Sequence, residues 1–528
     1  MKSNYIVFIA LTDYDNLGVG YMASALTEAG FKTKIFDFRI RKSIMLKKLK
    51  SIDPLVIGFS VIFLNFMNKY IELIEYLRNG GLKCHFTAGG HYASLRYAEL
   101  FKIAPELDSI IRFEGEFPIV ELAKRLSAGN EWRTIRSLAF ITDGKITANP
   151  VWKHERDIDK FPFPYRSQLK KYAFNKKFTA ILAGRGCIHN CSFCNTRAFY
   201  RQASCPLKRI RKPEGVVNEM EYLFTEKDCS VFLFQDDDFP VKSKMQNNWI
   251  KAFCNELERT GLGKKVMWKM ACRPDEIEEE SFNIMKNNGL FQVFVGIEDG
   301  THEGLKRLNK HLEVNTIRKG IRTLKKLSLD FDFGFILFQP ETTCKTLNEN
   351  LDFLMEICSD GYTPVTFLKL IPLYETQIEK ELLRSGRLKP SDKLNDYDFP
   401  EEPMNRYYQF IMDCFGEWLR DPGGVENISK CARNYYSVYM HFFDASPETK
   451  KYYLRLRRII SESNIFLIEN MKELSVIYFQ NQDKNLSLAT GSYLNIIKLK
   501  HDYFKNKIIR NMAGFLSYAE EKQIITIA

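Results

Sequence analysis

A short loop with three cysteines constrains this 528-residue chain more than any other feature. In the stretch GRGCIHNCSFCNTRAFY, Cys187, Cys191 and Cys194 follow the spacing Cys-x3-Cys-x2-Cys. Soft thiolate ligands of this kind suit iron and sulfur. A structural zinc site normally takes four protein ligands, and His189, the nearest fourth candidate, lies inside the first gap, where binding would strain the loop. The spacing therefore favours a metal centre with one open position over buried, idle thiols.

The loop resembles the cluster loop of radical S-adenosylmethionine (SAM) enzymes, whose Cys-x3-Cys-x-aromatic-Cys pattern is matched with Phe193 as the aromatic residue. The resemblance implies that Cys187, Cys191 and Cys194 hold a 4Fe–4S cluster and that Phe193 contacts SAM. It also implies that the open iron binds the amino and carboxylate groups of SAM. An electron from the cluster would then release a 5′-deoxyadenosyl radical, which abstracts hydrogen from unactivated carbon.

The length predicts two or three domains, and 45% hydrophobic residues permit packed cores. No apolar run approaches the roughly 20 residues that a membrane span needs. The start, MKSNYIVFIALTDYDN, shows no cleavage site of a signal peptide, and the other cysteines form no disulfide framework. We therefore expect a cytoplasmic protein. The net charge of +12 is spread over a lysine-rich chain, so no nucleic-acid partner is expected.

Alternating strand and helix patterns fill the first 125 residues. The runs NYIVFIAL, FKTKIFDF, PLVIGFSVI and LKCHFTAGG have strand character, and the helical pattern VGYMASALTEAG ends at Gly30. Continuous apolar strands separated by helices indicate a parallel sheet covered on both faces, here a Rossmann-like domain. We expect this domain over residues 1–125 and a connector over 126–175, with a hairpin turn at Asp143-Gly144.

Polar and glycine-rich turns follow these strands, where the crevice of such a sheet binds ligands. Together they resemble the cobalamin-binding domain that precedes many radical SAM domains. The resemblance implies cobalamin contacts at Leu17, Gly18, Ser60, Gly89, Gly90, His91, Glu114, Gly115 and Glu116. Phe113 departs from the usual glycine of the last motif. Asp15 stands where other cobalamin domains carry the cobalt-ligating histidine, so cobalt would lack that ligand, and a domain that does not bind cobalamin is the alternative.

A second series of strands begins at Lys177, with the runs FTAILAG, SVFLFQ, KVMWKMA, FQVFVGI, FDFGFILF and TPVTFLKL. Six strand–helix units imply a partial (β/α)6 barrel over residues 176–374, with its site at the strand ends. The cysteine loop follows the first strand. By resemblance to the family, Asp236, Asp237, Arg273 and Glu298 at the ends of later strands would contact SAM. The run from Gly334 to Pro340 resembles the pattern near adenine, although Phe338 and Gln339 depart from it.

Residues 375–528 show helical spacing of aromatic and basic residues and predict a helical C-terminal region that shapes the substrate pocket. The resemblance implies a cobalamin-dependent methyltransferase acting on an unactivated carbon of a secondary metabolite or peptide. It also implies a reducing electron donor such as flavodoxin or ferredoxin. The alternatives are a non-methylating cyclisation, rearrangement or peptide modification, an N-terminal docking module that binds no cobalamin, and a non-enzymatic metal protein. Methylthiolation of transfer RNA is disfavoured because the N-terminal region has no second cysteine cluster.

Overall fold

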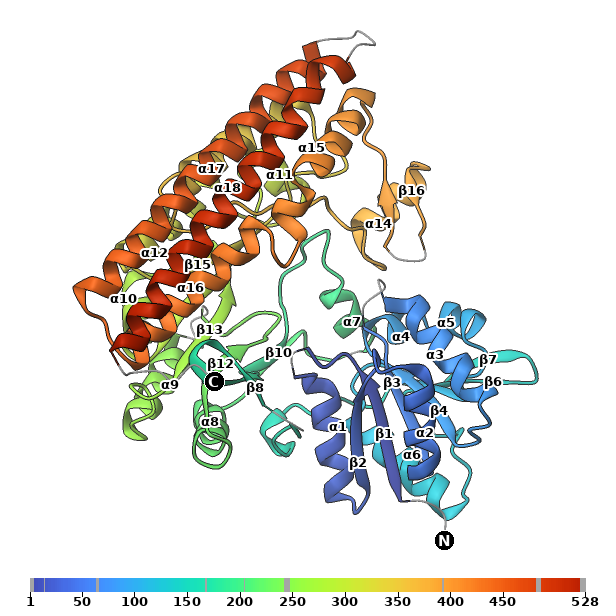
Figure 1. The fold of residues 1–528 in the computed structure, drawn as a ribbon. Helices are drawn as coiled ribbons and strands as arrows, with labels where there is room; N and C mark the ends of the chain where they lie inside the picture. Colours follow the sequence, from blue (N-terminus) through green and yellow to red (C-terminus); the bar gives the residue numbers. More distant parts are fainter. Residues whose placement is uncertain are drawn as a thin grey trace.

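The computed structural model describes residues 4–13, 15–62, 66–166, 169–203, 205–241, 247–391, 394–480 and 486–522. The chain forms an N-terminal α/β region, a second α/β region with a curved sheet, and a helical C-terminal region (Figure 1). This architecture confirms the predicted fold class.

The N-terminal sheet has the strand order β2-β1-β3-β4-β5-β6-β7, in which β1 to β5 are parallel. Alternate residues of β1 face opposite cores: Phe8 packs with α1 and α6, whereas Ile9 packs with α2 and α3. Burial on both faces explains why β1 reads as a continuous apolar run. The strands are β1 Tyr5–Ala10, β2 Lys32–Asp37, β3 Val56–Ser60, β4 His85–Gly89, β5 Ser109–Ile111, β6 Leu138–Thr142 and β7 Lys145–Ala148. The helices are α1 Leu17–Glu28, α2 Lys42–Ile52, α3 Met67–Asn79, α4 His91–Leu95, α5 Tyr97–Ile103 and α6 Glu116–Ala128.

Strands β6 and β7 form the predicted hairpin. Asp143 and Gly144 both have positive φ, +51° and +72°, as the two central residues of a type I′ turn require. The hairpin is not a separate piece, because β6 pairs antiparallel with β5, with Ile111 opposite Leu138. The N-terminal sheet therefore continues into residues that were expected to belong to the connector.

The second sheet has the order β15-β14-β13-β12-β9-β8, in which β9, β12, β13, β14 and β15 are parallel and the short edge strand β8 is antiparallel. Its strands are β8 Lys170–Lys171, β9 Lys177–Ile181, β12 Cys229–Phe234, β13 Met267–Cys272, β14 Leu290–Glu298 and β15 Asp330–Phe335. A two-stranded ribbon, β10 Gly184–Gly186 and β11 Lys208–Ile210, adjoins it. The helices of this region are α7 Thr196–Gln202, α8 Pro213–Lys227, α9 Asn247–Arg259, α10 Glu279–Asn287, α11 His302–Arg307, α12 Val314–Lys326 and α13 Cys344–Cys358.

The sixth predicted barrel strand, TPVTFLKL, is not a regular strand. Only an isolated bridge between Phe338 and Lys369 joins it to the chain after β15. Leu368 N donates to Phe335 O at 3.0 Å and Leu370 N donates to Phe338 O at 2.9 Å, so the segment lies beside the end of β15 without forming a ladder along it. The partial barrel thus has five parallel strands among the described residues.

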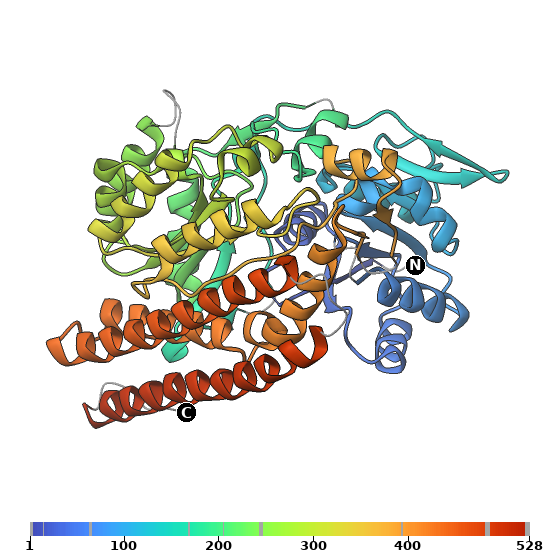
Figure 2. The same ribbon diagram turned by 90° about the horizontal axis from the view of Figure 1, so that it is seen from above.

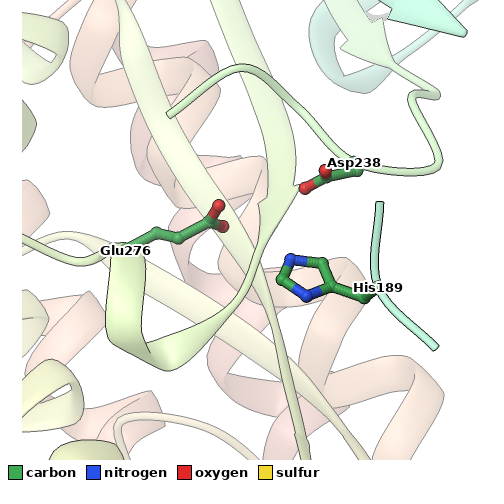
Figure 3. A group of neighbouring side chains, drawn as sticks. All are labelled: His189, Asp238 and Glu276. Atoms are coloured by element: carbon green, nitrogen blue, oxygen red, sulfur yellow. The ribbon is translucent and has the colours of Figure 1, made fainter. Parts of the chain in front are cut away.

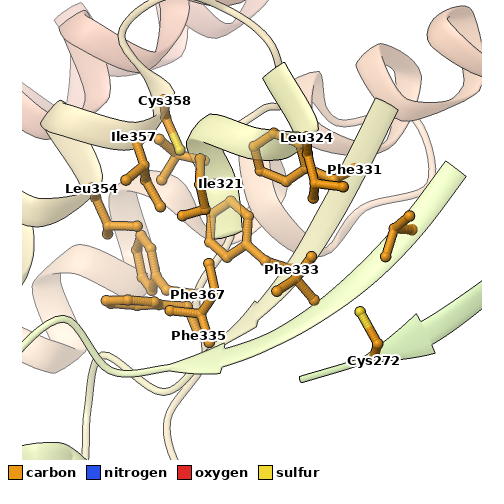
Figure 4. Close-up of a cluster of buried hydrophobic side chains, with 14 of the residues drawn as sticks. Cys272, Ile321, Leu324, Phe331, Phe333, Phe335, Leu354, Ile357, Cys358 and Phe367 are labelled. Carbon is orange, nitrogen blue, oxygen red and sulfur yellow. The ribbon is translucent and has the colours of Figure 1, made fainter. Parts of the chain in front are cut away.

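Strand β15 shows how this barrel packs. Its alternate residues Phe331, Phe333 and Phe335 are buried against α12 and α13 (Figure 4). The residues between them, Asp332 and Gly334, lie on the opposite face, because successive side chains of a strand alternate. On β15, the outer face therefore belongs to an apolar core, and the inner face carries Asp332 and Gly334.

The C-terminal region is helical, as expected. It comprises α14 Gln377–Arg384, the strand pair β16 Leu388–Lys389 and β17 Asp396–Tyr397, and the helices α15 Glu402–Arg420, α16 Val425–Phe442, α17 Pro447–Gln480 and α18 Leu486–Glu521. The long helices α17 and α18 run side by side (Figures 1 and 2). The buried Arg433 of α16 donates to Asp332 Oδ1 at 2.7 Å and to Phe331 O at 3.0 Å, which fixes the region to β15. None of the described helices is both long enough and apolar enough to cross a membrane.

Candidate functional site

The cysteine loop leaves the barrel through the ribbon β10–β11. Gly186, directly before Cys187, has a φ of +87°, and a Cβ there would overlap the carbonyl oxygen of Leu207. Only glycine fits this position without strain. Beyond the ribbon, Ser192 N donates to Leu308 O at 3.0 Å, and Ile378 N of α14 donates to Ser192 O at 3.2 Å. The loop is therefore held both by the barrel and by the C-terminal region.

The three predicted cluster ligands, Cys187, Cys191 and Cys194, are free thiols and partly exposed. Their sulfur atoms are wider apart than a single-ion site allows. Zinc–sulfur bonds of about 2.3 Å place tetrahedral sulfurs about 3.8 Å apart, whereas these thiols form no group whose ligand atoms all lie within 4.8 Å in the described part of the chain. The donor set thus fits a cluster of several irons rather than one zinc ion, and the assignment of the three ligands stays a prediction.

Asp236 and Asp237 follow β12 and accept hydrogen bonds from the segment that leads into the cysteine loop. Asp236 Oδ1 accepts from Ala183 N at 3.0 Å and from Gly184 N at 2.6 Å, and Asp237 Oδ2 accepts from Gly186 N at 3.1 Å. Burial raises the pKa of Asp236 to about 7. Both carboxylates therefore brace the loop. Their predicted contact with SAM remains a prediction.

Phe193, Arg273 and Glu298, the other predicted SAM residues, surround Lys310, which the sequence analysis did not identify. Lys310 Nζ lies 3.2 Å from Glu298 Oε1 and 5.9 Å from the ring centroid of Phe193. Lys310 O accepts a hydrogen bond from Arg273 Nη2 at 2.8 Å. Glu298 has a φ of +70°, a backbone conformation that residues other than glycine rarely adopt. Residues held in such conformations cluster at functional sites. Lys310 belongs to no motif, so only the fold reveals it.

A cavity of about 460 Å³ lies at the carboxyl ends of β1, β3 and β4. All nine predicted cobalamin residues line it: Leu17, Gly18, Ser60, Gly89, Gly90, His91, Glu114, Gly115 and Glu116. Gly90 has a φ of +111°, and a Cβ there would lie 2.7 Å from Val61 O. At Gly18, by contrast, a Cβ would meet only the side chain of Asn16, at 3.8 Å. The lack of a Cβ at Gly18 therefore leaves space in the cavity. The glycine-lined wall fits the close approach of a bulky ligand.

The second region closes this cavity. Leu182, Gly184, Arg185, Gln235 and Asp237 contribute to its lining, together with two aromatic residues of α7. One of these, Phe199, stacks on His91 with ring centroids 4.2 Å apart and an interplanar angle of 7°. Burial lowers the pKa of His91. The predicted cobalamin residues and the strand ends of the barrel therefore share one cavity.

Buried ion pairs join the two regions at the same place. Arg185, just before the cysteine loop, lies 2.8 Å from Glu116 Oε1 and 3.2 Å from Glu114 Oε1, and Arg209 of β11 also pairs with Glu114. Against the effect of burial, Arg185 and Arg209 lower the pKa of Glu114 to about 2. The sequence motif pointed to the two glutamates, but no sequence pattern pointed to their arginine partners.

Asp15, at the place of the missing histidine, also joins the two regions. Its Oδ2 accepts hydrogen bonds from Thr179 Oγ1 at 2.5 Å and from Ala180 N at 3.1 Å, both in β9. The carboxylate is thus bonded to the barrel, although Asp15 also lines the cavity.

Comparisons with known proteins distinguish the same two regions of the chain, the N-terminal α/β region and the barrel. The family model described as Radical SAM superfamily matches residues 181–354, and that described as B12 binding domain matches residues 5–123. The chain is 25% identical over 419 residues to the anaerobic magnesium-protoporphyrin IX monomethyl ester cyclase of Rubrivivax gelatinosus, covering 75% of this chain and 73% of the relative. It is 23% identical over 453 residues to the cytidylyl-2-hydroxyethylphosphonate methyltransferase of Streptomyces wedmorensis, covering 74% and 82%.

Two solved structures share the fold. The cobalamin-dependent S-adenosylmethionine radical enzyme OxsB, with aqua-cobalamin bound, matches all of this chain and 82% of its own at a TM-score of 0.71 and 16% identity. The radical SAM methyltransferase TsrM from Kitasatospora setae matches 72% of this chain and 76% of its own at 0.61 and 18% identity. Taken with the two family models and the two sites described above, this places the chain in the family of radical SAM enzymes that carry an N-terminal cobalamin-binding domain.

Proposed function

We propose that the chain is a cobalamin-dependent radical SAM methyltransferase that acts on an unactivated carbon of a secondary metabolite or peptide. The observation that carries this proposal is the shared cavity, in which the residues of the cobalamin motif meet Gly184, Arg185 and Asp237 from the entrance to the cysteine loop. When bound, the cluster with SAM supplies hydrogen-atom abstraction and cobalamin supplies a methyl group. Both act on one substrate carbon only if their sites face each other.

The protein's own residues would bind and orient these groups. Cys187, Cys191 and Cys194 would hold the cluster, and the glycine-lined wall around Gly89 and Gly90 would admit cobalamin. The ion pairs of Arg185 with Glu114 and Glu116 hold the cavity wall against the entrance to the cysteine loop. Pre-positioning of this kind is what a reaction between two separately bound groups requires.

The segment after the fifth barrel strand is our candidate for the substrate-binding wall. Leu368 and Ile371 are apolar and yet 42% and 38% exposed, and Tyr374 O–H donates to Ile62 O of the cobalamin cavity at 3.4 Å. The segment therefore extends from the barrel to the cavity, as a wall that contacts the substrate would. Its exposed apolar side chains favour a substrate with an apolar portion.

Non-methylating chemistry is the second candidate, because relatives named as cyclases match three quarters of the chain. The test starts from anaerobically purified protein supplied with cobalamin, with iron, sulfide and cobalamin quantified. Metabolite and peptide pools are then incubated with SAM that carries a trideuterated methyl group and a low-potential flavodoxin. A deuterated product together with S-adenosylhomocysteine supports methyl transfer. A changed product without deuterium, formed with 5′-deoxyadenosine, would support the second candidate instead.

A further inference from the structure

The inner face of the barrel is accessible along three neighbouring strands, β13, β14 and β15. Side chains alternate along a strand, so Val293 and Val295 of β14 face the outer apolar core and Phe294 between them faces the interior. Phe294 is 47% exposed, although β14 is paired on both sides. Lys269 of β13 and Asp332 of β15 are also partly exposed on this face. In a complete (β/α)8 barrel, layers of side chains fill the interior. The exposed ring of Phe294 therefore indicates that side chains leave part of this interior unfilled.

Small residues extend this space toward the predicted SAM residues. Ala271 of β13 is paired with Phe294, and one step further along the same face Gly296 of β14 is paired with Gly334 of β15. A Cβ at Gly334 would lie 3.4 Å from the ring of Phe294 and 3.0 Å from Glu298 Oε2. Because these positions carry no bulky side chain, the interior stays open between Phe294 and Glu298.

The two ends of the interior differ. At the amino ends of the strands, Met267 of β13 packs with Val438 and Phe442 of α16, which closes that end. At the carboxyl ends, Leu182 and Gln235 line the cavity of about 460 Å³ described above. A ligand in the interior would therefore lie between α16 and the cavity that the predicted cobalamin residues line.

Lys269 places an ammonium group without a partner in this interior. Among the residues that the structure describes, its Nζ forms no hydrogen bond and no ion pair of 4.0 Å or less. The Nζ atom is nevertheless accessible, since it is not sealed among the buried polar atoms that lack a partner. Burial lowers the pKa of Lys269, which means that the surroundings disfavour its charged form. An anion beside Nζ would offset this cost.

The acidic residue whose charge acts on Lys269 is already neutralised. Asp332 Oδ1 accepts a hydrogen bond from Arg433 Nη1 at 2.7 Å, and its other oxygen accepts from a glutamine amide of β14 at 3.1 Å. Lys430 of α16 adds positive charge nearby, although it pairs with Glu426 at 2.6 Å. The surroundings of Lys269 therefore favour an anionic ligand.

The neighbourhood of Lys269 defines the kind of anion. Phe294 is paired with Ala271, two residues after Lys269 on the same face, so its exposed ring and the ammonium border the same space. A lysine ammonium is a point charge that pairs with carboxylates and phosphates alike. We propose that Lys269 binds a carboxylate or phosphate group of the substrate inside the barrel, and that Phe294 contacts the adjoining apolar portion.

This inference deepens the proposed function, because it names the substrate class of the same site: an organic anion with an apolar portion. Lys269 is paired with Leu233 of β12, and Gln235, which lines the shared cavity, follows two residues later. Two residues of a strand span about 7 Å. A substrate held at Lys269 would thus reach the cavity with a carbon roughly 7 Å or more from its anionic group.

The first test needs no turnover. The anaerobically reconstituted full-length protein, with and without SAM, is acetylated with a trace of N-acetoxysuccinimide, and mass spectrometry of peptides measures the rate at Lys269. Phenyl phosphate and phenylacetate are the anionic probes, and benzyl alcohol is their neutral counterpart. Titration with the anion that fits should lower the rate at Lys269 about tenfold as the probe reaches about ten times its dissociation constant. The exposed Lys265 serves as the reference amine in the same digests.

The two anions distinguish a phosphate from a carboxylate as the group that Lys269 binds. Phe294→Ala should weaken protection by the aromatic probe and leave protection by inorganic phosphate or acetate unchanged. Tyr222→Ala removes a similarly exposed aromatic ring, 40% exposed on α8, and should change neither.

Four outcomes of this labelling would overturn the proposal. Lys269 could prove unreactive without SAM or probe, so that the interior admits no solute. SAM alone could abolish the labelling, so that the ammonium belongs to the cofactor site. Neither anion could protect Lys269, or benzyl alcohol could protect it as well as the anions do.

The second test uses turnover. Anion exchange divides the metabolite and peptide pools, and each fraction is incubated with SAM that carries a trideuterated methyl group. Labelled product should arise from the retained, anionic fraction. Lys269→Met should raise KM for that substrate about 10–100-fold, because it removes a contact between charged groups. Lys269→Arg keeps the charge and should restore part of the affinity, and Lys265→Met should leave KM unchanged.

The two proposals can fail separately. Protection of Lys269 by an anion without any methylated product would overturn the methyltransferase and leave the anion site intact. A methylated product from a neutral substrate, formed with the same KM by Lys269→Met, would overturn only the anion site.

Discussion

The cavity lined by the predicted cobalamin residues and the polar group beside the cysteine loop are built in different ways. Glycines and backbone line the cavity, and the charged residues at its edge, Glu114 and Glu116, already pair with arginines of the second region. The polar group consists of the side chains of His189, Asp238 and Glu276 from three separate segments (Figure 3), with His189 left unpaired toward the two carboxylates in the described structure. Shape defines the first site and charge defines the second. Mutations in the cavity should therefore change the space available to a ligand or the contact between the two regions. Mutations in the polar group should change individual polar interactions.

The largest effect is expected at the cluster. Cys191→Ala removes one of three thiolates from a loop without a spare ligand, so iron and sulfide content should fall to background. Turnover should fall by more than about 1000-fold, because the cluster carries the chemistry. Cys431→Ala changes an exposed thiol far from the loop in sequence and should keep both iron and activity. Full activity of Cys191→Ala would remove the cluster from the mechanism.

The interdomain ion pairs should give the next largest effect. Arg185→Ala leaves Glu114 and Glu116 buried without this partner, which costs about 3–5 kcal/mol in free energy of unfolding. Denaturant unfolding measures this loss, and cobalamin affinity should fall with it. Arg458→Ala breaks an exposed pair with Glu462 and should cost less than about 1 kcal/mol. Equal effects of the two variants would mean that charge does not hold the cavity wall.

Alanine substitutions at two glycines of the cavity distinguish the effect of backbone strain from the effect of lost space. Gly90→Ala forces a side chain onto a φ of +111° and against Val61 O, so it should lower the free energy of unfolding by more than about 1 kcal/mol. Gly18→Ala meets only the side chain of Asn16 and should change stability by less than about 0.5 kcal/mol. Both should weaken cobalamin binding in spectroscopic titrations. Unaltered affinity in Gly18→Ala would show that the ligand does not reach this wall.

The smallest effect concerns pH. Burial lowers the pKa of His85 in β4 from 6.5 to about 4, and its Nε2 lies 2.8 Å from Ser109 Oγ. The unfolded chain therefore takes up this proton first, so the contribution of His85 is complete above pH 6.5 and declines as pH falls toward 4. Between pH 7 and pH 6 the loss should be about 0.7 kcal/mol in free energy of unfolding. Denaturant unfolding of His85→Gln at both pH values should lack this difference.

Local patterns were enough for several elements. The cysteine spacing, the Asp143-Gly144 turn, the four strands expected in the first 125 residues and the helical C-terminal region each depend on neighbours in the chain. Apolar runs, turn residues with positive φ and helical periodicity act within a few residues. For the same reason, the three-residue strand β5 was missed, because it is too short to show a period.

The sequence by itself determined the class of protein, the likeness to radical SAM and cobalamin-binding families, and a set of predicted cofactor residues, nine of which line one cavity. Only the tertiary structure decided how those residues are used. Asp236 and Asp237 look equivalent to Asp238 in the run QDDDF, yet the turn after β12 directs two of them to the backbone and the third to His189 and Glu276. Arg185 pairs with Glu116, 69 positions earlier in the chain, and Lys310 pairs with Glu298, 12 positions earlier and on another element. Such pairings depend on which strand ends the folded sheet brings together, and no local sequence pattern encodes contacts of this kind.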